Sequence, residues 1–185
     1  MEQKRAVFLD RDGVINVNHG FVHDSKSFEF IDGIFDLARA AHTNGYMLIV
    51  ITNQSGIGRG YYSEHQFHKL TEWMCNEFSN LGTPIEKVYF SPFHPIAGCG
   101  AYKKDDVSRK PRPGMIFQAQ REMNLDLRSS ILIGDNASDI QAGIAAGIGR
   151  NILFSQKQPP ELTGQPYHAI KILRDALPFI NSSYK

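Results

Sequence analysis

The stretch VFLDRDGVIN, residues 7–16, decides the expected fold and points to the chemistry of the protein. Its apolar start is typical of a buried strand, and the strand ends at two acids, Asp10 and Asp12, followed by Gly13. An extended chain projects residues two apart to the same side, so these two carboxylates repel each other unless a positive charge lies beside them. We therefore predict a strand that ends in a cation-binding pair of acids.

Short apolar runs alternate with segments of helical periodicity along the rest of the chain. Strands are predicted at residues 6–10, 47–53, 87–92, 129–135 and 150–154, and helices at 33–46, 63–82, 114–125 and 138–147. Ser63 is the expected cap of the second helix, and residues 168–180 have room for a short strand and a last helix. This alternation is typical of an α/β fold, a Rossmann-like parallel sheet between two layers of helices. We expect one domain over residues 1–185.

The composition argues against several classes of function. The 20 basic and 19 acidic side chains give a net charge of +1, which offers no basis for binding nucleic acid or an acidic membrane. No apolar run reaches the ~18 residues that a membrane helix needs, and the N-terminal residues enter a strand too early for a signal peptide. Cys75 and Cys99 make neither a disulfide framework nor a metal-ligand cluster. We expect a cytoplasmic protein, monomeric, with a small-molecule substrate.

Polar residues gather directly after the predicted strands. The groups are Asp10 and Asp12 after the first strand, Thr52 to Gly56 after the second, Arg109 and Lys110 before the helix at 114, and Gly134, Asp135, Asn136 and Asp139 after the fourth. Taken singly, each group has an ordinary explanation as a turn, a surface lysine or a helix cap. Because the carboxyl ends of parallel strands share one edge of the sheet, their joint occurrence indicates a single site at that edge.

The residue types of this set suit phosphoryl transfer. The carboxylates of Asp10 and Asp135, with the backbone carbonyl of Asp12, offer the hard oxygen ligands that Mg²⁺ prefers. The second oxygen of Asp10 would then be free to attack phosphorus and form an aspartyl phosphate. Asp12 would protonate the leaving oxygen and later deprotonate the attacking water. Lys110 and the groups around Thr52 would neutralise the phosphoryl oxygens.

At this point the sequence resembles the haloacid dehalogenase (HAD) superfamily. Its four motifs appear as FLDRDGVIN (8–16), ITNQSGIGRG (51–60), SRKPRPGM (108–115) and LIGDNASDIQAG (132–143). The chain is most similar to the branch that contains the D-glycero-D-manno-heptose 1,7-bisphosphate 7-phosphatases and the histidinol-phosphate phosphatases. The resemblance implies a HAD-type core. The short spacings between the motifs leave no room for a separate cap domain.

The resemblance also implies a role for each matching residue. Asp10 matches the nucleophile and Asp12 the general acid and base, while Mg²⁺ would be held by Asp10, Asp12 and Asp135. Thr52 and Lys110 match residues that steady the phosphoryl group. Substrate contacts are implied for Asn18, His19, Gly20, Phe21, Asn53, Gln54, Ser55, Arg109 and Asn136. Among these, Arg109 would recognise the far end of the substrate, such as a second phosphate.

The chain departs from the family pattern in one loop, residues 91–108. Many members bind zinc there through a C-x-H pair and a C-x-C pair, but the four ligand positions hold Ser91, Phe93, Asp106 and Ser108. The remaining candidates, His94 and Cys99, are too few for a four-ligand structural zinc site, so no zinc is expected. The loop must then be ordered by its own packing or by substrate, and it is the expected specificity loop.

The resemblance implies a Mg²⁺-dependent phosphatase that removes the C7 phosphate of a heptose bisphosphate, a step toward nucleotide-activated heptose for cell-surface polysaccharide. The alternative in the same class is a histidinol-phosphate phosphatase or a broader sugar-phosphate phosphatase. A signalling receiver domain also uses Asp, Thr and Lys around Mg²⁺, but its phosphorylated Asp ends a mid-chain strand, which this sequence lacks. A non-catalytic sugar-phosphate binder is disfavoured because Asp10, Asp12, Lys110 and Asp135 are all present.

Overall fold

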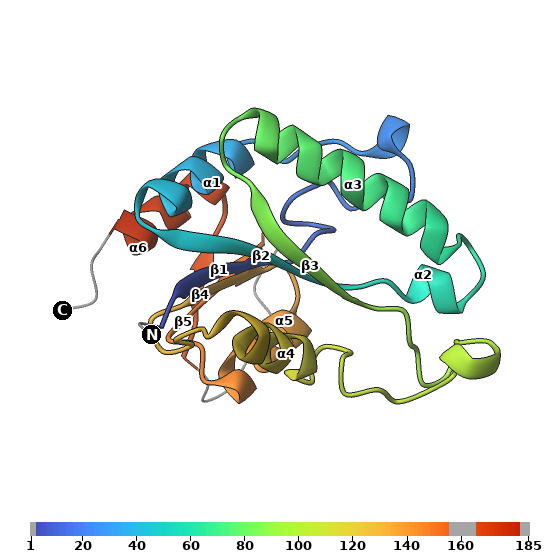
Figure 1. The fold of residues 1–185 in the computed structure, drawn as a ribbon. Helices are drawn as coiled ribbons and strands as arrows, with labels where there is room; N and C mark the ends of the chain where they lie inside the picture. The colour runs from blue at the N-terminus through green and yellow to red at the C-terminus, as the bar shows by residue number, and fades with distance from the viewer. Residues whose placement is uncertain (1–2, 156–165, 182–185) are drawn as a thin grey trace.

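The computed structural model describes residues 3–155 and 166–181, and its centre is one six-stranded sheet in which every pairing is parallel (Figure 1). The strands are β1 (Arg5–Leu9), β2 (Tyr46–Asn53), β3 (Ile85–Ser91), β4 (Ile131–Gly134), β5 (Arg150–Phe154) and β6 (His168–Ile170). Their order across the sheet is β3-β2-β1-β4-β5-β6. The predicted parallel sheet is confirmed, including the short strand in the C-terminal segment.

Helices cover both faces of the sheet and complete the expected three layers. They are α1 (Ile34–Thr43), α2 (Ser55–Gly58), α3 (Glu64–Asn80), α4 (Gly114–Met123), α5 (Ala137–Ala146) and α6 (Leu177–Asn181). Figure 1 shows α1, α3 and α6 on one face and α4 and α5 on the other. No helix in the described ranges combines the length and the apolar composition needed to cross a membrane.

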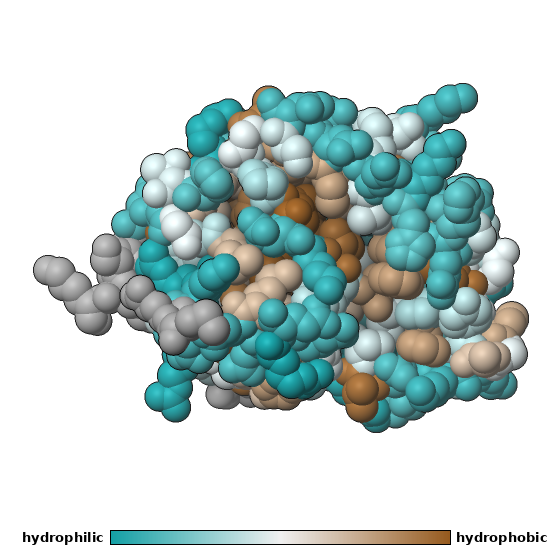
Figure 2. Space-filling model, in the orientation of Figure 1, coloured by the Kyte–Doolittle hydropathy of each residue, from teal (hydrophilic) through white to brown (hydrophobic). Residues whose placement is uncertain are grey.

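Two hydrophobic cores lie on the two sides of the sheet. Along β1, Val7 and Leu9 belong to the core under α1 and α3, whereas Ala6 and Phe8 belong to the core under α4 and α5. A strand that is buried on both faces must be apolar at every position, which explains the continuous apolar runs in the sequence. Hydrophilic residues cover most of the face seen in Figure 2, and hydrophobic ones show mainly between the two helical layers.

The ends of the elements follow local signals that the sequence carries. Ser63 caps α3 as predicted, because its hydroxyl accepts the Gln66 N–H while the Gln66 side chain accepts the Ser63 N–H. Gly147 ends α5 in a left-handed conformation. The one-turn helix α2 was not predicted, because its sequence SGIG has the composition of a turn.

The strand order decides where a site can form. The chain leaves β1 toward β2 on one side of the sheet and returns to β4 on the other side. Loops that follow neighbouring strands therefore diverge at the carboxyl ends of β1 and β4, the point at which open α/β sheets bind ligands. The motifs at residues 8–16 and 132–143 lie next to each other at this point of the sheet.

Candidate active site

Three carboxylates converge at the carboxyl ends of β1 and β4. Asp10 follows β1, Asp135 follows β4, and Asp139 lies in the first turn of α5; one oxygen from each lies within 4.8 Å of the others. Gly13 has a φ of +99°, and a Cβ there would lie 2.1 Å from Oδ2 of Asp135. The loop after β1 can approach Asp135 this closely only because residue 13 has no side chain.

A single buried lysine faces these acids. The Lys110 ammonium lies 2.9 Å from Oδ1 of Asp10 and 2.6 Å from Oδ1 of Asp139, and it donates a 2.8 Å hydrogen bond to the Ile51 carbonyl. Burial lowers the pKa of Lys110, but the ion pairs with Asp10 and Asp139 outweigh burial and raise it above its usual value. Lys110 is therefore a fixed positive charge in the site.

The cluster holds three carboxyl groups, and Lys110 supplies one positive charge to balance them. Burial raises the pKa of Asp10 from 3.8 to about 8; Lys110 opposes this rise, and Asp139 and Asp135 add to it. Burial, followed by the charge of Asp139, raises the pKa of Asp135 to about 6. Three acids, of which Asp10 and Asp139 are buried and Asp135 is half-buried, face one ammonium, and their oxygen donors fit a divalent cation such as Mg²⁺.

Asp12 lies outside the acid cluster, and its carboxylate is held in one orientation by several donors. Arg11 donates from Nη2 at 2.8 Å and from Nε at 3.2 Å, both to Oδ2. Gln54 donates to the same oxygen at 2.9 Å, and Asn16 donates to Oδ1 at 3.1 Å. A carboxylate that is fixed in one orientation and stands apart from the cluster Asp10, Asp135 and Asp139 is suited to an acid–base role.

Arg11 is a positioning residue that the sequence prediction missed. Its side chain is 1% exposed, and besides Asp12 its Nη2 donates a 2.7 Å hydrogen bond to the Val22 carbonyl. The guanidinium carbon lies 5.8 Å from the centre of the Phe67 ring. The available signal was an arginine between two acids at the end of an apolar strand, because such an arginine must be buried with its partner.

The residues at the end of β2 and directly after it hold site residues in place through hydrogen bonds. Gln54 is buried, and its amide nitrogen also donates to the Thr52 hydroxyl at 2.8 Å, while the Tyr62 hydroxyl donates to its carbonyl oxygen. Asn53 exchanges two 3.1 Å hydrogen bonds with the backbone of Lys110. These contacts give Gln54 and Asn53 positioning roles, and their contact with substrate stays a prediction. Ser55 begins α2 and is partly exposed.

The segment from Asn18 to Phe21 forms an exposed rim. The Asn18 side chain accepts the Gly20 N–H at 3.1 Å, and the ring of His19 lies 3.3 Å from Glu29. Phe21 has a φ of 53°, and its ring packs edge-on against Tyr61 at 4.6 Å. The segment is thus stiffened by its own contacts before any ligand binds.

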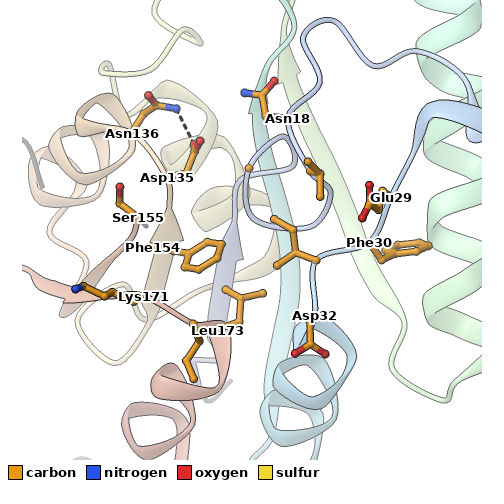
Figure 3. Close-up of a pocket in the computed structure, with 14 residues that line it drawn as sticks. Asn18, Glu29, Phe30, Asp32, Asp135, Asn136, Phe154, Ser155, Lys171 and Leu173 are labelled. Carbon is orange, nitrogen blue, oxygen red and sulfur yellow. Dashed lines mark hydrogen bonds between the residues drawn. The ribbon is translucent and has the colours of Figure 1, made fainter. Parts of the chain in front are cut away.

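One cavity of about 860 Å³ opens beside this rim (Figure 3). Asn18, Asp135 and Asn136 lie at one end, and Asn136 donates a 2.6 Å hydrogen bond to Asp135. The other end is bounded by Lys171 and Leu173. The cavity therefore brings together three of the predicted site residues, but Arg109 is not among the described residues that line it.

The loop 91–108 is ordered by its own side chains. The Ser108 hydroxyl lies 3.0 Å from the Ser91 hydroxyl and 2.8 Å from Oδ1 of Asp106, which in turn pairs with Lys104 at 2.7 Å. The next residue, Arg109, donates from Nη1 to the Phe93 carbonyl at 3.0 Å. Packing within the loop, one of the two expected sources of its order, is therefore observed.

The sheet, the acid cluster and the buried lysine define a phosphatase of the HAD class. Residues 7–159 match the family model described as polynucleotide kinase 3 phosphatase, and the chain belongs to this family.

The chain is also similar to individual heptose bisphosphate phosphatases, in sequence and in structure. The chain is 49% identical over 178 residues to a D-glycero-alpha-D-manno-heptose-1,7-bisphosphate 7-phosphatase from Burkholderia mallei, covering 96% of this chain and 94% of the relative. It is 47% identical to a D-glycero-beta-D-manno-heptose-1,7-bisphosphate 7-phosphatase from Vibrio cholerae, covering 84% of each. The structure of D,D-heptose 1,7-bisphosphate phosphatase from B. bronchiseptica with magnesium and phosphate superposes with a TM-score of 0.78 at 26% identity, covering 95% of this chain and 97% of that one.

Proposed function

We propose that this protein is a Mg²⁺-dependent phosphatase that removes the C7 phosphate of D-glycero-D-manno-heptose 1,7-bisphosphate. The observation that carries the proposal is the buried cluster of Asp10, Asp135 and Asp139 around Lys110, with Asp12 held separately by Arg11. The names of the two relatives support the choice of substrate. The product would supply nucleotide-activated heptose for cell-surface polysaccharide.

In the first step, a carboxylate oxygen of Asp10 attacks phosphorus and the bond from phosphorus to the C7 oxygen breaks. Asp12 gives its proton to that leaving oxygen, because a sugar alkoxide is a poor leaving group. The Lys110 ammonium would neutralise charge on the phosphoryl oxygens, and the Thr52 hydroxyl, which already accepts a hydrogen bond from Gln54, would donate one to them. The phosphoryl group is now an acyl phosphate on Asp10.

In the second step, Asp12 takes a proton from water as the water attacks phosphorus, and the bond from Asp10 to phosphorus breaks. Inorganic phosphate leaves, and Asp12 is protonated again for the next cycle. Mg²⁺, held by Asp10, Asp135 and the Asp12 carbonyl, would offset the negative charge shared by carboxylates and phosphate. Asp139 keeps the Lys110 ammonium in place at 2.6 Å throughout.

The second phosphate of the substrate distinguishes this proposal from histidinol-phosphate hydrolysis. Arg109 makes no ion pair among the described residues, so its guanidinium charge is available to an anion. Histidinol phosphate carries an amine at its other end, which a guanidinium repels. The two relatives are named for different heptose anomers, so both anomers belong in the test.

We also propose that the protein works without bound zinc. In the described residues, one group of three or more His, Cys, Asp or Glu side chains is close enough to hold a metal ion, and it is the Asp10 cluster rather than the loop 91–108. At the zinc-ligand positions of related proteins, the Ser108 hydroxyl donates to the Ser91 hydroxyl and to the Asp106 carboxylate. We also propose a single-domain, cytoplasmic monomer.

The test is phosphate release with Mg²⁺ from the α and β anomers of the heptose bisphosphate and from histidinol phosphate. We expect a strong preference for one heptose anomer, unchanged by removal of zinc. Asp10→Asn should abolish release and keep the fold by circular dichroism, while Asp175→Asn, at an exposed acid outside the cluster, should match the wild type. Faster turnover of histidinol phosphate would refute the substrate, and an active Asp10→Asn would refute the mechanism.

A further inference from the structure

Two arginines of the site region lack a negative partner. Arg59 follows α2 and Arg109 precedes the buried Lys110, and neither forms an ion pair within the described residues. By contrast, Arg112 in the same loop region pairs with Asp105. Two uncompensated guanidinium groups near a phosphatase centre offer about two positive charges, which matches one phosphate group.

The backbone brings these two arginines to the same short segment, residues 92–99. Directly before Arg59, the Gly58 carbonyl accepts the Cys99 N–H at 2.7 Å, and a Cβ on Gly58 would lie 2.4 Å from the Pro92 carbonyl oxygen. Arg109 donates to the Phe93 carbonyl at 3.0 Å. Burial and then the nearby Arg59 charge lower the pKa of Arg109, as expected for two like charges close to each other.

The Arg59 guanidinium lies against the rim formed by residues 18–21. Its central carbon lies 5.7 Å from the centre of the Phe21 ring, and Phe21 is itself packed against Tyr61. The Nε atom of Arg59 is buried and has no hydrogen-bond acceptor among the described residues. A buried N–H group without an acceptor costs desolvation free energy. A ligand oxygen that accepted from Arg59 Nε would remove this cost.

His94 adds a neutral donor beside the two arginines. Its Nδ1 accepts the backbone N–H groups of Ile96 at 3.2 Å and Ala97 at 2.9 Å, so Nδ1 carries no proton and Nε2 carries the hydrogen. Burial, Arg109 and Arg59 together lower the pKa of His94, which keeps the ring neutral. The ring can therefore donate to an anion without adding to the repulsion between the arginines.

We propose that Arg59 and His94 join Arg109 in a second anion subsite that binds the phosphate group not being hydrolysed. The ligand class is a sugar bisphosphate, and the inference rests on the proposed function. The subsite is built in advance, because the Ser91–Ser108–Asp106 hydrogen bonds fix the chain directly before Arg109. It makes Arg59 a specificity-determining residue, which the sequence motif alone did not reveal.

The experiment compares bisphosphates with monophosphates of the same sugar size. For wild type and Arg59→Gln, kcat/KM is measured with the heptose 1,7-bisphosphate, and with the pair fructose 1,6-bisphosphate and fructose 6-phosphate. We expect Arg59→Gln to lower the ratio of bisphosphate to monophosphate efficiency about 10- to 100-fold, mainly through KM, because a charge-assisted hydrogen bond is lost. Arg59→Lys should recover part of the ratio, and His94→Ala should lower it by a smaller factor.

Arg112→Gln is the matched control, because this arginine lies in the same loop region but is already paired with Asp105. It should leave the ratio unchanged. A wild-type ratio in folded Arg59→Gln and Arg59→Lys would overturn the inference while the heptose assignment stands. If the heptose bisphosphate is a poor substrate but the fructose pair shows an Arg59-dependent ratio, the proposed substrate fails and the subsite is supported.

Discussion

Replacement of Gly13 by alanine tests whether the close approach of the β1 loop to Asp135 sets the geometry of the acid cluster. A Cβ at residue 13 would lie 2.1 Å from Oδ2 of Asp135, whereas carbon and oxygen atoms in contact are separated by about 3.4 Å or more. The carboxylate must therefore move by roughly 1 Å, and metal-ligand distances tolerate only about 0.2 Å. We expect weaker Mg²⁺ binding and a loss of about 100-fold in kcat/KM.

Gly45→Ala is the matched control for the backbone strain of the same change. Gly45 also has a positive φ, +73°, but no atom lies within 4 Å of the position that a Cβ would take. Both variants should lose about 1–3 kcal/mol of unfolding free energy from the backbone strain. Gly45→Ala should keep its Mg²⁺ affinity, measured by calorimetry, and its turnover. Wild-type Mg²⁺ affinity and kcat/KM in Gly13→Ala would show that the close approach of residue 13 does not set the position of Asp135.

Three further predictions concern the groups around the acid cluster. Arg11→Lys keeps the charge but loses the forked contact with Asp12, so kcat should fall about 10- to 100-fold; an unchanged kcat would contradict this role. The raised pKa values of Asp10 and Asp135 mean that the metal-free fold holds protons that the unfolded chain has released. Its unfolding free energy should therefore fall as pH rises from about 4 to 8, and Mg²⁺ binding at pH 7 should release protons, measurable by calorimetry in buffers of different ionisation enthalpy. Equal binding enthalpies in those buffers would contradict this. Ser108→Ala removes two hydrogen bonds of the loop 91–108, so limited proteolysis should cut that loop faster than in wild type, and an equal rate would mean that other contacts order it.

Much of the fold was predictable because its signals are local. Strands buried on both faces are apolar at every position, and Ser63 and Gly147 mark helix ends through hydrogen bonds to residues a few positions away. The helix α2 was missed because its glycines favour a turn in isolation. Its helical turn is held by long-range contacts, such as that between Gly58 and Cys99.

The candidate site was predictable to the extent that it follows strand ends. Asp10 and Asp135 come together because they follow adjacent parallel strands; the sequence indicated the shared edge of the sheet, and the strand order made β1 and β4 neighbours. The direction in which each side chain turns was not predictable. Asp12 turns toward Arg11 and Gln54, and Asp139, which read as a helix-cap acid, turns toward Lys110 from the first turn of α5.

The amino-acid sequence was enough to predict the class of fold, the edge of the sheet at which the site lies, and the residue types gathered there. These properties depend on the periodicity of apolar residues and on residues that are close together in the sequence. The burial of Arg11 beside Asp12 is seen in the three-dimensional structure alone, and so are the contacts that Gly58, next to Arg59, and the Arg109 side chain both make with residues 92–99. Such pairings depend on how separate loops pack against one another, and the free energy of that packing is a property of the whole fold.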